Sequence, residues 1–166
     1  MKKIQFKNKP NTDTPINDDN LNLLQENIEE ALVKQSIFLG MNEQTGYSSA
    51  TPVAFNKVKN RNGEQLILEN NFIKIGTGIL KIRIDVYLSV GAYEAKQVPL
   101  LRLYKNDEQI AQTGISCIEA WSTENLILVG VIVDVVEGDL IKAYITGNSN
   151  SVIVRSISTM TVEQVA

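Results

Sequence analysis

Apolar and polar residues alternate along most of the chain after residue 51, which is the pattern of strands with one buried face. In Leu80–Tyr87 the even-numbered residues are apolar, whereas Lys81, Arg83 and Asp85 occupy the opposite face. Gly, Asn, Asp, Ser and Glu separate about ten such segments, so we expect a mainly β sandwich or jelly roll. The expected strands are 52–58, 64–70, 72–75, 78–90, 98–106, 108–113, 124–136, 139–146, 151–157 and 159–165.

One segment departs from this alternation. Leu126–Val136 (LILVGVIVDVV) is apolar almost throughout, which is typical of a strand covered on both faces. One cover is the domain's own core, and a second subunit is the simplest second cover. The alternative is a central strand covered by a loop. The first interpretation predicts that Leu128, Val131 and Val133 lie in an intersubunit core.

A different periodicity precedes the strands. Asn17–Leu39 has apolar residues at three- and four-residue spacing, a capping residue at its start and Gly40 after its end, so we expect one helix. It is interpreted either as an amphipathic helix on its own domain or as a short coiled coil. In the second case the a and d positions are Leu21, Leu24, Ile28 and Ala31.

The first sixteen residues are polar and show no extended periodicity. They contain Pro10 and Pro15, and their few apolar residues include Ile4, Phe6 and Ile16. A segment of this composition buries too little apolar surface to fold alone, so we expect an extended arm that orders against a partner. The predicted organisation is therefore an arm at 1–16, a helix at 17–40, a linker at 41–50 and a jelly-roll head at 51–166.

Composition narrows the chemistry. The net charge is −3 and the basic residues are scattered, so the chain is not expected to have the basic face of a nucleic-acid-binding protein. No apolar run is long enough for a membrane span or a secretory signal. The chain has no histidine and one cysteine, which removes catalytic triads and His or Cys metal sites. No motif pairs the carboxylates for hydrolysis, so we expect a non-enzymatic protein with no cofactor and no metal.

Three short motifs allow a binding role and also a structural one. Glu137-Gly138-Asp139 offers oxygen ligands to calcium, but a turn is the simpler interpretation. Gly76-Thr77-Gly78 lies between two expected strands and is interpreted as a hairpin turn. Trp121 and Tyr93 are candidate exposed groups that stack against a saccharide, but a partly buried core residue is the simpler interpretation of Trp121.

The order of signals in the head resembles the tumour-necrosis-factor-like and complement-globular-head jelly roll. The matching pieces cover roughly 51–166, and they lack most of the aromatic ladder of the animal members. This resemblance implies a ten-stranded trimerising module. The pieces are Phe55, Asn62-Gly63, Asn71–Ile75, Gly78–Ile82, Leu101–Asp107, Val135–Ile141 and Met160–Val165.

The arm and helix resemble a second group. The pattern Pro15, Ile16, Asn17, Asn20, Leu21, Asn22 and Ile28 looks like the N-terminal segment of fibre, baseplate and receptor-binding proteins of phages of low-GC Gram-positive bacteria. This resemblance implies that Ile4, Phe6, Pro10, Pro15 and Ile16 anchor the chain to a virion capsid or baseplate protein.

Together these patterns predict a homotrimeric knob of a virion assembled in the host cytoplasm, attached by its N-terminus and adhering to a host surface. A dedicated carbohydrate-binding module at the tail tip is the alternative. The expected partners are two further copies of the chain, a capsid or baseplate protein and, as a further candidate, a host cell-wall glycan. Nucleic acid and membrane are not expected partners.

Overall fold

A computed structural model of the chain describes residues 22–25, 33–47, 51–116, 119–147 and 151–165. The chain divides into two units, Met1–Lys34 and Gln35–Ala166. In the first unit residues 22–25 are helical and Leu24 is exposed. The other coiled-coil positions, Leu21, Ile28 and Ala31, lie outside the described residues, as does the whole predicted arm. The coiled coil therefore stays a prediction.

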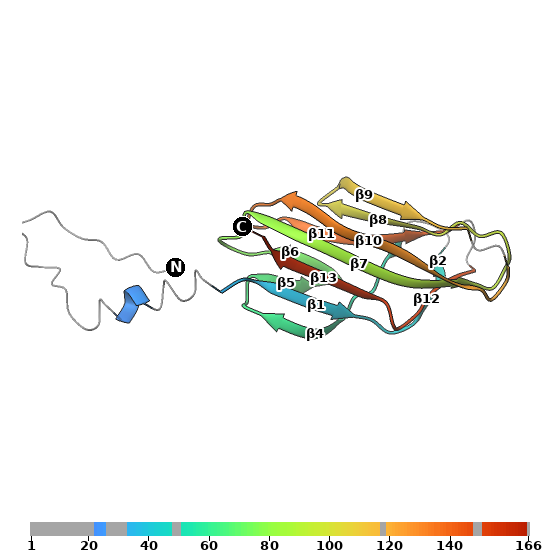
Figure 1. Cartoon of the computed structure of the whole chain (residues 1–166), viewed down its shortest axis with the longest axis horizontal. Helices are drawn as coiled ribbons and strands as arrows, with labels where there is room; N and C mark the ends of the chain where they lie inside the picture. Colours follow the sequence, from blue (N-terminus) through green and yellow to red (C-terminus); the bar gives the residue numbers. More distant parts are fainter. Residues whose placement is uncertain (1–21, 26–32, 48–50, 117–118, 148–150, 166) are drawn as a thin grey trace, which may run out of the picture. The chain divides into compact units, whose positions relative to one another are not determined.

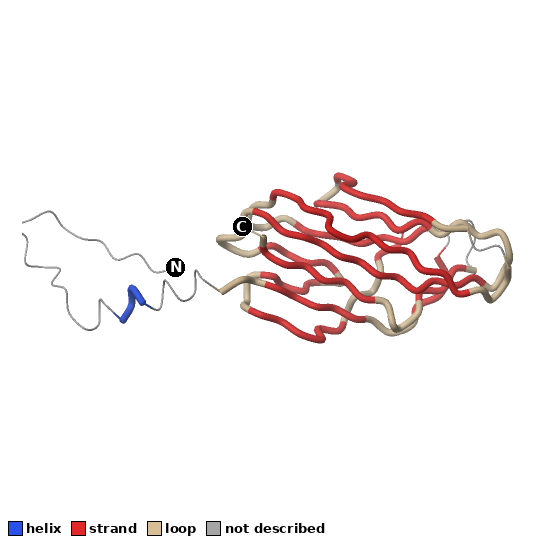
Figure 2. Tube along the Cα trace, in the orientation of Figure 1, coloured by secondary structure: helices blue, strands red, loops and turns tan. Residues whose placement is uncertain are grey.

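The second unit is a sandwich of two antiparallel sheets, as the alternation predicted (Figure 2). The larger sheet has the order β2-β12-β7-β13-β1-β4, and β10 pairs with the other edge of β7 (Figure 1). Its strands are β1 (Ser36–Gly40), β2 (Gln44–Tyr47), β4 (Lys57–Asn62), β7 (Lys81–Ala92), β10 (Thr123–Asp134), β12 (Val152–Val154) and β13 (Thr159–Gln164).

The smaller sheet covers the opposite side of the core. Its order is β5-β6-β11-β8-β9, and the short β3 pairs with β11. Its strands are β3 (Thr51–Pro52), β5 (Leu66–Glu69), β6 (Phe72–Ile75), β8 (Leu100–Lys105), β9 (Glu108–Gly114) and β11 (Leu140–Thr146).

The start of the head differs from the prediction. Ser36–Gly40 was expected at the end of the helix but forms β1, which pairs with β13 and β4. Ile37 and Leu39 are buried on one side, whereas Ser36 and Phe38 lie on the other, so the segment also fits period two. The predicted linker at 41–50 contains β2, and its first residue, Met41, belongs to the core. The head therefore begins near Gln35, not at residue 51.

The alternation in β7 is confirmed. Ile82, Ile84 and Val86 are fully buried, and the residues between them lie on the outer face of the sheet. Leu80 is the exception, because it precedes the strand and is 68% exposed. Burial of such aliphatic side chains from both sheets supplies the main stabilisation of the sandwich.

Candidate functional site

A row of exposed aliphatic side chains runs along β10, on the outer face of the larger sheet. Ile127, Val129 and Ile132 are 52, 62 and 58% exposed. We call these three residues the β10 ridge. Exposed apolar residues that follow one another on a single strand are typical of a surface that another molecule covers.

A β-bulge sets the direction of these side chains. Leu128 pairs with Val86 and Val131 with Ile84, so β10 has one residue more than β7 between the two pairs. Gly130 occupies this bulge with φ of +72°, and its N–H donates to a carboxylate oxygen of Asp85. Simple alternation would place Leu128 and Val131 on opposite faces, but the extra residue brings both inward.

The predicted head residues of the trimer interface are therefore not the exposed ones. Leu128, Val131 and Val133 are partly buried and pack against the sandwich's own core. The aliphatic residues that this strand exposes are instead those of the β10 ridge. The sequence did show that aliphatic residues fill both faces of this strand. It did not show the bulge that decides which of them point inward.

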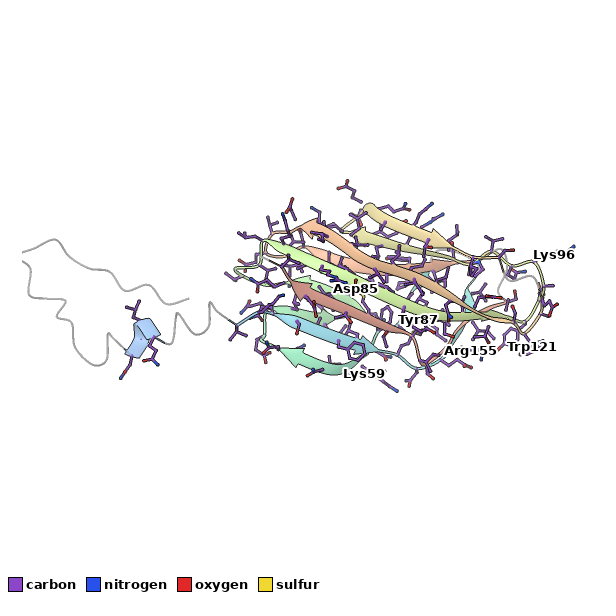
Figure 3. The ribbon with its side chains drawn as sticks, in the orientation of Figure 1. Lys59, Asp85, Tyr87, Lys96, Trp121 and Arg155 are labelled. Atoms are coloured by element: carbon purple, nitrogen blue, oxygen red, sulfur yellow. The ribbon has the colours of Figure 1, made fainter. Side chains whose placement is uncertain are left out.

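Charged and polar pairs line the ridge on the same face. Arg83 contacts Asp85 at 3.1 Å, Lys81 contacts Asp134 at 3.2 Å, and the Tyr87 hydroxyl donates to the Asn125 side-chain oxygen at 2.8 Å. Such exposed pairs contribute little to folding stability. They do fix the polar groups that a facing surface would have to match. Figure 3 shows Asp85 and Tyr87 on β7.

The structure brings together the two residues predicted as a ligand loop. The Trp121 and Tyr93 rings meet edge to face with 4.6 Å between their centroids. The backbone N–H of Trp121 donates to the Ala92 carbonyl, and the backbone N–H of Tyr93 donates to the Ser151 carbonyl. Trp121 is 66% exposed, so it is not a partly buried core residue. Its φ of +64° is a strained backbone conformation for a bulky side chain.

This aromatic pair lies at one end of the sandwich. β1 begins and β13 ends at the opposite end of the unit, whereas Trp121 lies where β7 ends and β10 begins (Figures 1 and 3). The end that carries Trp121 is therefore the one farther from the point where the N-terminal segment joins the head.

The Glu137–Asp139 motif forms the expected turn. Gly138 has φ of +92°, and Asp139 is buried with both carboxylate oxygens used: they accept hydrogen bonds from the Asn106 side chain at 2.8 Å and from the Val136 N–H at 3.0 Å. Within the described residues, no group of three or more His, Cys, Asp or Glu side chains is arranged to hold a metal ion. In the same part of the chain, no helix is long and apolar enough to cross a membrane.

The outer face of the smaller sheet carries a hollow that the sequence did not predict. It has a volume of about 210 Å³ and is lined by Tyr104, Asn106, Asp107, Lys142 and Tyr144. We call it the tyrosine pocket. Alternation in β8 and β11 was enough to place both tyrosines outward, but the chain alone did not show that these two strands are neighbours.

Comparison with known proteins identifies the fold. No protein-family model and no curated sequence matches the chain. Among solved structures, murine APRIL at pH 8.0 is 11% identical with a TM-score of 0.59 and covers 80% of this chain and 99% of its own. The vertex protein P5 of phage PRD1 is 14% identical with a TM-score of 0.51 and covers 81 and 99%.

A third structure, the Eiger tumour necrosis factor of S. frugiperda, is 9% identical with a TM-score of 0.53 and covers 81% of this chain and 94% of its own. At these identities the likeness establishes the fold alone. The head is thus a jelly-roll sandwich of the kind found in the tumour necrosis factor family and in a phage vertex protein.

Proposed function

We propose that this chain is a non-enzymatic structural protein of a phage virion, a homotrimeric knob attached to the particle by its N-terminal segment. The observation that carries the proposal is the β10 ridge on a head of this fold. Three isoleucine and valine side chains facing water are unfavourable in a monomer, and their burial against a second copy relieves that cost. The flanking ion pairs supply the polar rim of such an interface.

The division of the chain supports the attachment role. The described strands all lie in Gln35–Ala166, and the separate unit Met1–Lys34 carries the segment whose sequence resembles phage anchoring arms. In this proposal the first unit binds a capsid or baseplate protein and the second is displayed. Three copies on one particle convert a weak host contact into avidity.

A pull-down from disrupted virions tests the attachment. The full chain is compared with a chain that begins at Gln35. We expect the full chain alone to retain a capsid protein if it is a head fibre, or a baseplate protein if it belongs to the tail. Equal capture by both chains would place the attachment in the head and contradict the proposal.

The aromatic pair favours a second candidate function, a carbohydrate-binding module of the tail tip. Trp121 combines large exposure with a strained backbone, and it lies at the end of the head opposite the start of β1 (Figure 3). Replacement by alanine, followed by adsorption of the variant to host cell walls, tests this function. Adsorption equal to that of the unchanged chain would exclude Trp121 from the host contact.

A further inference from the structure

We propose that the tyrosine pocket binds a neutral saccharide, seated against Tyr104 and Tyr144. This goes beyond the proposed function, because it assigns a ligand to a face that neither self-association nor attachment uses. The pocket belongs to the smaller sheet, whereas the β10 ridge lies on the outer face of the larger one. A trimer in which the three ridges face a common axis leaves the pocket open.

Three aromatic rings form a platform across neighbouring strands. Tyr104 on β8 meets Tyr144 on β11 with 5.4 Å between the ring centroids and 77° between the planes. Phe72 on β6 lies 6.3 Å from Tyr144 at 27°. Aromatic residues make up only 6% of the chain, so this concentration is unusual for it. All three rings are half-buried and thus present apolar surface without being part of the core.

A donor and an acceptor are fixed beside the platform. The Lys142 ammonium lies 3.1 Å from the Asp107 carboxylate and 5.6 Å from the centroid of Phe72. The Lys142 side chain is 15% exposed, whereas that of Asp107 is fully exposed. Asn106 also lines the pocket, but its side chain is already hydrogen-bonded within the protein. It donates to Asp139 and accepts from the Leu140 N–H.

The tyrosine hydroxyls add unused hydrogen-bonding capacity. Within the residues that the structure describes, the hydroxyls of Tyr104 and Tyr144 make no hydrogen bond. Each hydroxyl can both donate and accept. The pocket therefore offers an apolar surface next to several groups of both hydrogen-bonding types.

These features select the ligand by its chemistry. The Lys142–Asp107 ion pair has no net charge, so an ionic ligand gains no net attraction from it, and an aliphatic ligand leaves the polar groups unpaired. A sugar ring suits both parts of the pocket, because its C–H face can pack on an aromatic ring while its hydroxyls can accept from the lysine and donate to the carboxylate. The volume of 210 Å³ is below the roughly 300–1,000 Å³ of pockets for drug-sized ligands, so it suits one ring of a longer glycan.

A glycan array tests the assignment. The full-length chain is applied to neutral oligosaccharides of hexoses and N-acetylhexosamines and to sialylated and uronic-acid glycans. We expect binding to neutral members, reduced about tenfold or more in Tyr104→Ala and Tyr144→Ala and about fivefold in Asp107→Ala. The fully exposed Asp107 provides a variant that does not depend on repacking the sheet. The control is Ile67→Ala, an exposed aliphatic of the same sheet outside the pocket.

Three results would overturn the inference: no binding to any neutral glycan, preference for acidic glycans, or loss of binding in Trp121→Ala with retention in Tyr144→Ala. The last result would move the site to the aromatic pair at the end of the head. Sedimentation of the same samples keeps the two proposals apart. A trimer without sugar binding contradicts only the pocket, and a monomer that binds sugar contradicts only the knob.

Discussion

The turn between β10 and β11 is held by one buried carboxylate. Asp139 accepts hydrogen bonds from the Asn106 side chain and the Val136 N–H, and Asn106 in turn accepts one from the Leu140 N–H. These bonds tie the β8–β9 turn to the start of β11. At the level of single residues, local geometry accounts for Asp139 without a bound ion.

We therefore expect Asp139→Ala to lower the free energy of unfolding by about 1–3 kcal/mol, because two donors in a part-buried site lose their acceptor. Urea unfolding followed by circular dichroism measures this loss. The matched variant is Asp107→Ala, which should change stability much less, because its carboxylate is fully exposed and its ion pair with Lys142 is screened by water. Equal losses for both variants would mean that Asp139 does not hold the turn.

Among the elements, the sequence predicted best those strands that have one solvent-exposed face and one buried face. β7, β8 and β11 alternate as expected, because each lies in a sheet with one side on the core. β1 was missed because Ile37 and Leu39 also suit a helix that continues from residue 17. Its pairing with β13, more than a hundred residues away in the sequence, decides in favour of a strand.

The position of β1 leads to a prediction about chains that are shortened at the N-terminus. The Gln35 carbonyl accepts from the Gln164 N–H, its side-chain oxygen accepts from the Gln65 N–H, and Ile37 and Leu39 are buried. A chain that begins at Gln35 should keep the cooperative thermal transition and β-type circular dichroism of the head. A chain that begins at residue 51 should lose both, because it lacks β1, which lies between β13 and β4. A folded 51–166 fragment would show that β1 is dispensable.

The N-terminal helix can be tested separately. If its a and d positions form a coiled coil, Leu24→Asp or Ile28→Asp should weaken the trimer, because a charge at the seam is costly to bury. Light scattering over a dilution series measures the change. A full trimer in both variants would argue that the head assembles without the helix.

β10 shows why the candidate site was predicted only in part. The apolar run predicted that this strand has a second cover, which stays a prediction, and the residues chosen for that interface, Leu128, Val131 and Val133, point inward in the structure. The bulge at Gly130 depends on the register against β7, which no local pattern reports. The tyrosine pocket was missed for the same reason, since it requires knowing that β8 and β11 pair.

For the whole molecule, assembly is proposed to involve the outer face of the larger sheet. Ile132→Asp should raise the dissociation constant of the trimer by at least about tenfold, because a carboxylate would be buried among aliphatic side chains. Ile67→Asp is the matched control, since Ile67 is an exposed isoleucine of the smaller sheet. Dissociation by Ile67→Asp and not by Ile132→Asp would place the interface on the other sheet.

The most direct measurement is analytical ultracentrifugation of the unchanged chain at micromolar concentration. We expect a species of three times the 18.4 kDa mass of one chain. A single species of 18.4 kDa would show that Ile127, Val129 and Ile132 remain in water, and it would contradict the trimeric knob.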